Sequence, residues 1–112
     1  MKALVLACVL LLAGCSVLQS KEALVFCQAA DTVTTLHALD LGAREANPVV
    51  DRLMDAFGPG GFVAAKLAVT LLFLHYFPQL SSDLVAVVNG ATCAIAAHNG
   101  YVASQMEHQA SE

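Results

Sequence analysis

Two residues of opposite charge, Asp31 and Lys66, lie in apolar stretches where a charge needs a partner. A charge at bilayer depth costs at least ~2.5–3.5 kcal/mol on insertion scales, and such side chains face an opposite charge or a cavity. Three kinds of chemistry are open to them: an ion pair that joins two helices, a proton or ion relay, or a lysine that snorkels to the interface near Glu45. We favour the ion pair.

The positions of the two charges support pairing. Asp31 precedes Asp40, where its helix is expected to end, by nine residues. Lys66 follows the expected start of its own helix, at Pro59 or Gly60, by six or seven. At ~1.5 Å rise per residue, both lie roughly 10–13 Å from the same membrane face. The sequence therefore predicts matched depths on adjacent antiparallel helices.

Four further polar residues accompany the charges: Thr34, Thr35, Asn89 and Asn99. Threonines within helices commonly bond to carbonyls of their own helix, and we expect this here. Asn89 and Asn99 are ten residues apart, nearly three turns, and so share a helix face. We expect these polar residues to form contacts within a helix bundle, with substrate contact by the asparagines as the alternative.

No pattern for catalysis or for a cofactor is present. There is no GxSxG motif, no phosphate-binding glycine loop and no nucleophile–base pair. His37, His75 and His98 lack the i,i+4 spacing of a helical metal site, and His75 is expected at the opposite membrane face from the other two. We therefore expect no enzymatic activity, no cofactor and no metal.

The two cysteines of the later segments, Cys27 and Cys93, lie in apolar surroundings. Cysteine in such a setting behaves as a small hydrophobe, which is the interpretation we favour. A bond between them is the alternative. The absence of a CxxC motif removes support for zinc or redox chemistry.

Composition indicates that the bilayer is the solvent. Hydrophobic residues make up 58% of the chain and charged residues 12%, against ~25% charged in an average soluble domain. A domain of this size could not bury so much apolar surface in water. The net charge is −4 and no basic run occurs, so nucleic acid is not an expected partner.

The elements that must position these residues are helices. Apolar stretches at 23–39, 62–77 and 84–103 predict three membrane spans. Glu45, Asn47 and Pro48 form a helix-turn motif, with Asn47 as the cap and Pro48 in the first turn of a short interfacial helix that ends at 58–61. The predicted fold class is all-α, a small membrane helix bundle.

The N-terminal segment carries an export signal. Lys2, the apolar run 3–11 and the sequence Leu12-Ala13-Gly14-Cys15 resemble the signal and lipobox of bacterial lipoproteins. That resemblance implies cleavage before Cys15 and lipidation of its thiol. The expected domains are a signal peptide (1–14), a linker (15–22), a membrane helical domain (23–103) and a polar tail (104–112). An uncleaved segment would instead add a fourth span with the same topology.

Basic residues predict the orientation. Arg44 and Arg52 lie between the first and second spans, whereas the next connection, 78–82, has no basic residue. The positive-inside rule then places the Arg44–Arg52 loop and the C-terminus in the cytoplasm, although Lys21 is a contrary charge outside. We expect the bacterial inner membrane, with a lipid-anchored N-terminus on the outer side.

The pattern Asp31-x-x-Thr34-Thr35, Glu45-x-Asn47-Pro48, Lys66 and Asn99 resembles a family of small uncharacterised bacterial integral-membrane proteins that share a domain of unknown function. The similarity covers roughly residues 23–102. It implies a bundle of about three membrane helices and no assigned activity.

The resulting expectation is a small, non-enzymatic, membrane-anchored structural or accessory protein. Its buried Asp–Lys pair would hold the bundle, and its partners would be the lipid bilayer and other membrane helices or a second copy. The alternative is a transporter-like or proton-relay component that uses Asp31, Lys66 and Asn99.

Overall fold

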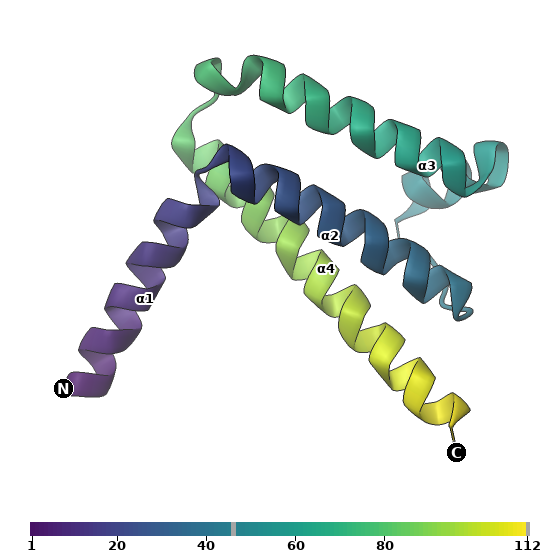
Figure 1. Ribbon diagram of the computed structural model, residues 1–112, viewed down its shortest axis with the longest axis horizontal. Coiled ribbons are helices and arrows are strands. Elements are labelled where there is room, and N and C mark those ends of the chain that lie inside the picture. The colour runs from purple at the N-terminus through teal and green to yellow at the C-terminus, as the bar shows by residue number, and fades with distance from the viewer. Residues whose placement is uncertain (46, 112) are drawn as a thin grey trace.

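The chain folds into helices alone across the residues that the computed structural model describes, 1–45 and 47–111, with side chains omitted at 9–15. The elements are α1 (Lys2–Leu18), α2 (Lys21–Asp40), α3 (Pro48–Tyr76), the short 3₁₀ helix η1 (Phe77–Gln79) and α4 (Ser82–Ala110). Figure 1 shows their order. The prediction of an all-α fold is confirmed.

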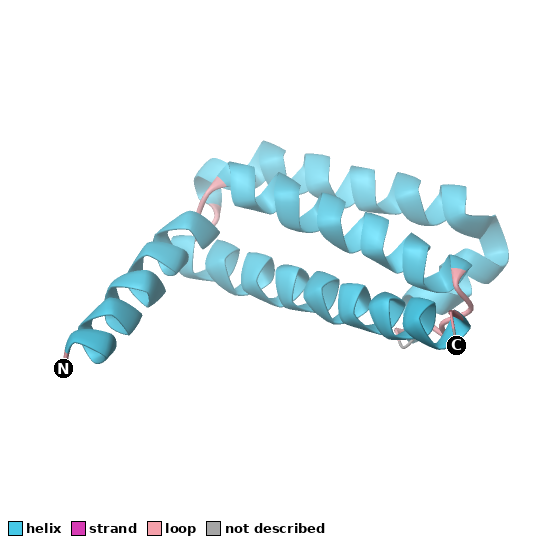
Figure 2. Ribbon diagram, turned by 60° about the horizontal axis from the view of Figure 1, so that its bottom comes forward, coloured by secondary structure: helices cyan, strands magenta, loops and turns pink. Residues whose placement is uncertain are grey.

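Helices α2 and α4 run in the same direction, and α3 returns between them in the chain. Later residues of α2 contact later residues of α4: Gln28 bonds to Thr92, and His37 bonds to Glu107. The molecule is flat, with extents of 45 × 41 × 19 Å. Helix α1 points away from the other three, as Figures 1 and 2 show.

Side-chain caps fix where three helices begin. Ser20, Asn47 and Ser81 each accept a hydrogen bond from a backbone N–H in the first turn of α2, α3 and α4. Each cap satisfies one of the amides that a helix start leaves without a partner. Pro48 follows Asn47 at the first helical position, as expected from the sequence.

Helix α3 is sharply kinked at Gly58, where φ is 74° and ψ is −176°. This conformation is open to glycine almost alone. A side chain at Gly61 would collide with Phe57 across the kink. The expected break thus lies in the predicted place. The helix resumes at Pro59, within the expected start at Pro59 or Gly60, because proline is well suited to a first helical turn.

Two segments expected to be irregular are largely helical. Only Gln19 and Ser20 separate α1 from α2 within the expected linker 15–22, and the expected polar tail 104–112 continues α4 to Ala110. Neither segment contains glycine or proline, so nothing in its backbone stops an established helix.

Several polar side chains are buried and many large apolar side chains are exposed, which is unusual for a protein in water. The buried residues include Gln28, Asp31, Thr35 and Asn89, while large apolar side chains are exposed, among them Leu67, Leu71, Phe26, Val33, Val87 and Ile95. Within the described residues, one helical stretch, Pro48–Gln79, is long and apolar enough to cross a membrane. Its mean hydropathy is 1.7 over its most apolar window, of which 6% is buried. The expectation of three spans therefore stays a prediction.

Candidate functional site

Asp31 and Lys66 meet at the contact between α2 and α3. Lys66 Nζ lies 2.5 Å from Asp31 Oδ2, and the two side chains are 23% and 9% exposed, respectively. The expected rival, Glu45, accepts a hydrogen bond from the backbone N–H of Asn47 at 3.0 Å. Among the described residues, the ion pairs of Lys66 include Asp31 and not Glu45.

Hydrogen bonds extend this ion pair to α4. Thr35 Oγ1 lies 3.4 Å from Asp31 Oδ1, and Asn99 Nδ2 donates to Thr35 Oγ1 at 2.9 Å and lies 3.5 Å from Asp31 Oδ1. Both carboxylate oxygens of Asp31 are therefore engaged. A buried charge is tolerated when its remaining lone pairs are satisfied in this way.

Gln28 is a member of the site to which sequence reasoning assigned no role. Its Oε1 accepts from Lys66 Nζ at 2.9 Å, and its Nε2 donates to Thr92 Oγ1 at 3.3 Å. The spacing of Gln28 could have indicated its role, because Gln28 precedes Asp31 by three residues and so shares its helix face. We call the joined set the polar network: Gln28, Asp31, Thr35, Lys66, Thr92 and Asn99.

Thr34 lies at the edge of this network. Its hydroxyl donates to the carbonyl of Ala30 at 2.8 Å, one turn back in α2, and Asn99 Nδ2 lies 3.5 Å from it. The stronger bond is thus to its own helix. Thr35, by contrast, faces the charge, because it lies four residues after Asp31 on the same face.

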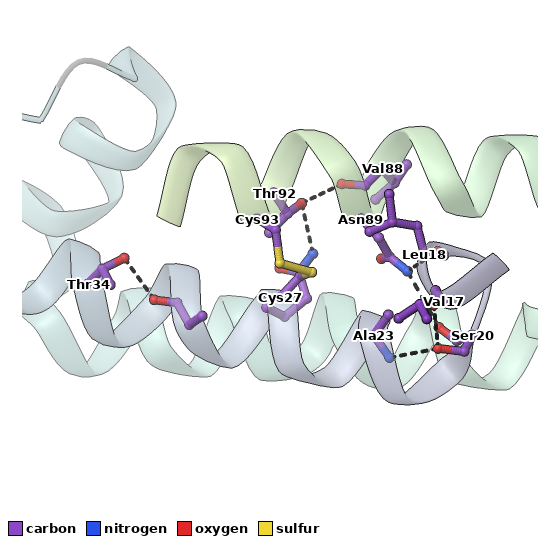
Figure 3. The surroundings of a disulfide bond; sticks show 12 residues. Val17, Leu18, Ser20, Ala23, Cys27, Thr34, Val88, Asn89, Thr92 and Cys93 are labelled. Carbon is purple, nitrogen blue, oxygen red and sulfur yellow. Dashed lines mark hydrogen bonds between the residues drawn. A yellow bond between two sulfur atoms is a disulfide. The ribbon is translucent and has the colours of Figure 1, made fainter. Parts of the chain in front are cut away.

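Asn89 serves a different part of the structure from Asn99. It is completely buried, and its Nδ2 donates to the backbone carbonyl of Leu18 at 2.8 Å, with Ser20 O at 3.5 Å. Figure 3 shows Asn89 of α4 directed at the junction of α1 and α2. The two asparagines share a face of α4, as expected, but Asn89 fixes a chain junction and Asn99 belongs to the polar network.

A disulfide bond between Cys27 and Cys93 joins α2 to α4 (Figure 3). It lies next in sequence to the hydrogen bond of Gln28 with Thr92. The Cα atoms are 4.8 Å apart, and Cys27 is 1% exposed. The favoured sequence interpretation, two separate small hydrophobes, is therefore wrong. Pairing depends on the relative height of two parallel helices, which no local motif records.

The polar network, apart from Gln28, lines a cavity of about 540 Å³. Asp31, Thr35, Lys66 and Asn99 contribute polar side chains to the lining. The helix-turn motif lines the same cavity through Glu45 and Asn47. The remaining lining residues are Ala38, Leu39, Ala43, Arg44, Val50, Phe62, Thr92, Ala94, Ile95, His98 and Val102.

The other candidate residues lie elsewhere. His37 Nε2 is 2.8 Å from Glu107 Oε1 in an exposed pair, and the His75 ring meets the Tyr76 ring edge to face. In the described part of the chain, no three His, Cys, Asp or Glu side chains are grouped to hold a metal. The side chain of Cys15, the predicted lipidation site, falls outside the described side chains.

We expect Asp31→Ala and Lys66→Ala each to lower the level of folded protein in membranes. Removing one partner leaves the other charge buried without compensation, a loss of about 3–5 kcal/mol. The exchange of Asp31→Lys with Lys66→Asp should recover part of that level. Immunoblots of membrane fractions measure it, and Glu45→Ala, which leaves the pair intact, is the control. Greater harm from Glu45→Ala, or no recovery in the exchange, would contradict the pairing.

We expect Cys93→Ser to lower the stability of the purified protein by about 2–4 kcal/mol, because the crosslink restricts the unfolded chain. Unfolding followed by circular dichroism should respond to a reductant in the wild type and not in the variant. The reduced wild type is the control, because it lacks the bond and keeps both cysteines. Maleimide labelling of Cys27 and Cys93 in denatured, unreduced protein would show that the bond is absent.

Most of the chain matches a known family model. Residues 22–103, which include the polar network, the helix-turn motif and the disulfide, match DUF5658, a domain of unknown function. No curated protein and no solved structure matches the chain significantly. The chain belongs to the DUF5658 family.

Proposed function

We propose that this protein is a small membrane protein with a non-enzymatic, structural or accessory role, whose helices α2, α3 and α4 cross the bilayer. The observation that carries the proposal is the ion pair of buried Asp31 with partly buried Lys66, inside helices with apolar outer surfaces. In water this arrangement would expose apolar surface and bury charge, both at a cost. In a bilayer the apolar surface contacts lipid, and the charges satisfy each other.

The lengths and faces of α2 and α4 support their role as spans. The 20 residues of α2 extend about 30 Å, close to the thickness of the hydrocarbon core. Gln28 and Asp31 of α2 and Asn89 of α4 are buried, whereas Phe26 and Val33 of α2 and Val87 and Ile95 of α4 are exposed. These helices are too polar to insert readily alone, but their polar atoms bond to one another inside the bundle.

The proposed orientation has the Arg44–Arg52 loop and the C-terminus in the cytoplasm of a bacterium, with the inner membrane as its location. The positive-inside rule supports it. The disulfide is a second, independent support. Cys27 lies six residues, about 9 Å, from the start of α2, which is the outer end in this orientation. Disulfides form and persist on the oxidising, exported side of the membrane.

We also propose that residues 1–14 are a signal peptide and that Cys15 is the lipid-anchored N-terminus. The side chains of residues 1–8 are all exposed, so removal of this part of α1 takes little packing from the other helices. Asn89 binds the carbonyl of Leu18, which would remain after cleavage. The anchored end would therefore stay attached to α4.

The expected partners are lipid and apolar helices, including a second copy of this chain. Helix α3 supports this interpretation, because Phe62 is its only buried residue. Its exposed apolar face offers a large surface to acyl chains or to another helix.

A transporter-like or proton-relay component is the second candidate. The cavity favours it, since Asp31, Lys66 and Asn99 line a space large enough to admit water or a small solute.

Replacing both charges, Asp31→Leu with Lys66→Met, separates the two candidates. The purified wild type and the double variant are placed in vesicles that contain a pH-sensitive dye, and a proton gradient is applied. We expect both to match empty vesicles and the double variant to accumulate normally, because apolar side chains of similar volume can replace a buried ion pair by packing at the same contact. A proton flux in the wild type that the double variant lacks would favour the relay.

Reporter fusions test the topology. Alkaline phosphatase and a cytoplasmic fluorescent reporter are fused after Gly58, after Ser82 and at the C-terminus. We expect cytoplasmic behaviour at Gly58 and at the C-terminus, and exported behaviour at Ser82, because each intervening span reverses the side. Phosphatase activity at Gly58 would overturn the orientation.

The intact mass of the membrane-extracted protein tests the lipid anchor. We expect a chain that begins at Cys15 with added acyl mass, and we expect Cys15→Ser to retain residues 1–14, since the modified thiol is required for cleavage in the lipoproteins that this signal resembles. Cys8→Ser, within the segment to be removed, is the matched control. An unmodified full-length mass for the wild type would refute the anchor.

A further inference from the structure

We propose that the cavity of about 540 Å³ binds an amphiphilic anion, a molecule with an apolar body and one carboxylate or phosphate group, and that Arg44 recognises the anionic group. The size lies within the range of small-molecule sites, about 300–1,000 Å³. A site of this kind combines apolar walls with a few placed polar groups.

The kink in α3 helps to form the cavity. Val50 lies before Gly58 and Phe62 lies after it, and both line the same space. A straight helix would carry these two side chains three turns apart along one axis. The glycine conformation at Gly58 thus places two apolar walls on one cavity.

Apolar side chains make most of the wall, which favours an apolar body in the ligand. Leu39 of α2, Val50 and Phe62 of α3, and Ile95 and Val102 of α4 contribute to it. Burial of an acyl chain against such side chains is favourable by about 0.8 kcal/mol per methylene group in general.

The charges of the lining favour an anionic group. Asp31 and Lys66 neutralise each other. Glu45 accepts from the backbone N–H of Asn47, at the positive end of α3, which offsets part of its charge. No hydrogen bond or ion pair within the described residues engages the guanidinium of Arg44.

Arg44 is therefore the cationic side chain of the lining that no described hydrogen bond or ion pair engages. A guanidinium suits a carboxylate or a phosphate, because its planar fork can donate two parallel hydrogen bonds to two oxygens. His98 lines the same cavity and offers a further donor.

Two sources could supply such a ligand, a fatty acid or an anionic phospholipid, and the test separates them. The protein is extracted from membranes and purified in a non-ionic detergent. Native mass spectrometry and the shift in unfolding temperature then report binding of two probes, decanoate and dioctanoyl phosphatidylglycerol. Each probe has a control without net negative charge: decanol for the first and dioctanoyl phosphatidylcholine for the second.

We expect at least one anionic probe to bind one to one and to raise the unfolding temperature, and its control to bind more weakly. Arg44→Gln should weaken that binding roughly tenfold or more, the effect of losing a charge-assisted hydrogen bond. Arg52→Gln removes a cation that is near in sequence but absent from the lining, and should bind as the wild type does.

A second pair of variants tests the place of binding. Ala94→Phe adds a large side chain to the lining and should abolish binding, whereas Ala97→Phe adds it to an exposed position of the same helix outside the lining. Equal binding of the controls without net negative charge, wild-type affinity in Arg44→Gln, or undiminished binding in Ala94→Phe would each overturn the proposal. None of these measurements depends on membrane topology. The proposed function can therefore fail while this inference holds, and this inference can fail while the proposed function holds.

Discussion

The ion pair of Asp31 with Lys66 is the interaction on which the attachment of α3 depends. Phe62 is the only buried residue of that helix, so little apolar packing holds it against α2. Lys66 instead bonds to Asp31 and to Gln28, two residues on one face of α2. Such a pair compensates its desolvation cost only when the surrounding hydrogen bonds are complete. Thr35 and Asn99 complete them on the side of α4.

The contact between α2 and α4 is built differently, from small side chains, a covalent bond and amides. Ala38 of α2 and Ala96 and Ala103 of α4 are buried, and small residues let two backbones approach closely. The disulfide between Cys27 and Cys93 fixes the register of these helices. Because the register is fixed, Asn99 of α4 lies within hydrogen-bond distance of Thr35 of α2. This contact adds α4 to the polar network. The α2–α4 unit therefore provides a rigid platform, and α3 is held against it chiefly by a charge.

This division explains why polar residues occupy the interior while apolar residues face outward. Hydrogen bonds and ion pairs gain strength where water is absent, and an unpaired polar group is costly there. The cavity lies where the two kinds of contact meet, between the platform and the kinked helix. Its lining combines residues of the polar network, the helix-turn motif and the apolar faces.

The sequence by itself determined the helices, the cap at Asn47, the break at Gly58 and the depth relation of Asp31 and Lys66, since each follows from local spacing, backbone preference or helical rise. It did not predict helical structure at 16–18 and 104–110, where a polar composition suggested a linker and a tail. Only the tertiary structure decided the bond between Cys27 and Cys93, the roles of Gln28 and Asn89, and the cavity beside Arg44. These features depend on the relative height and rotation of helices distant in the chain. Long-range packing sets that height and rotation, and no local pattern encodes them.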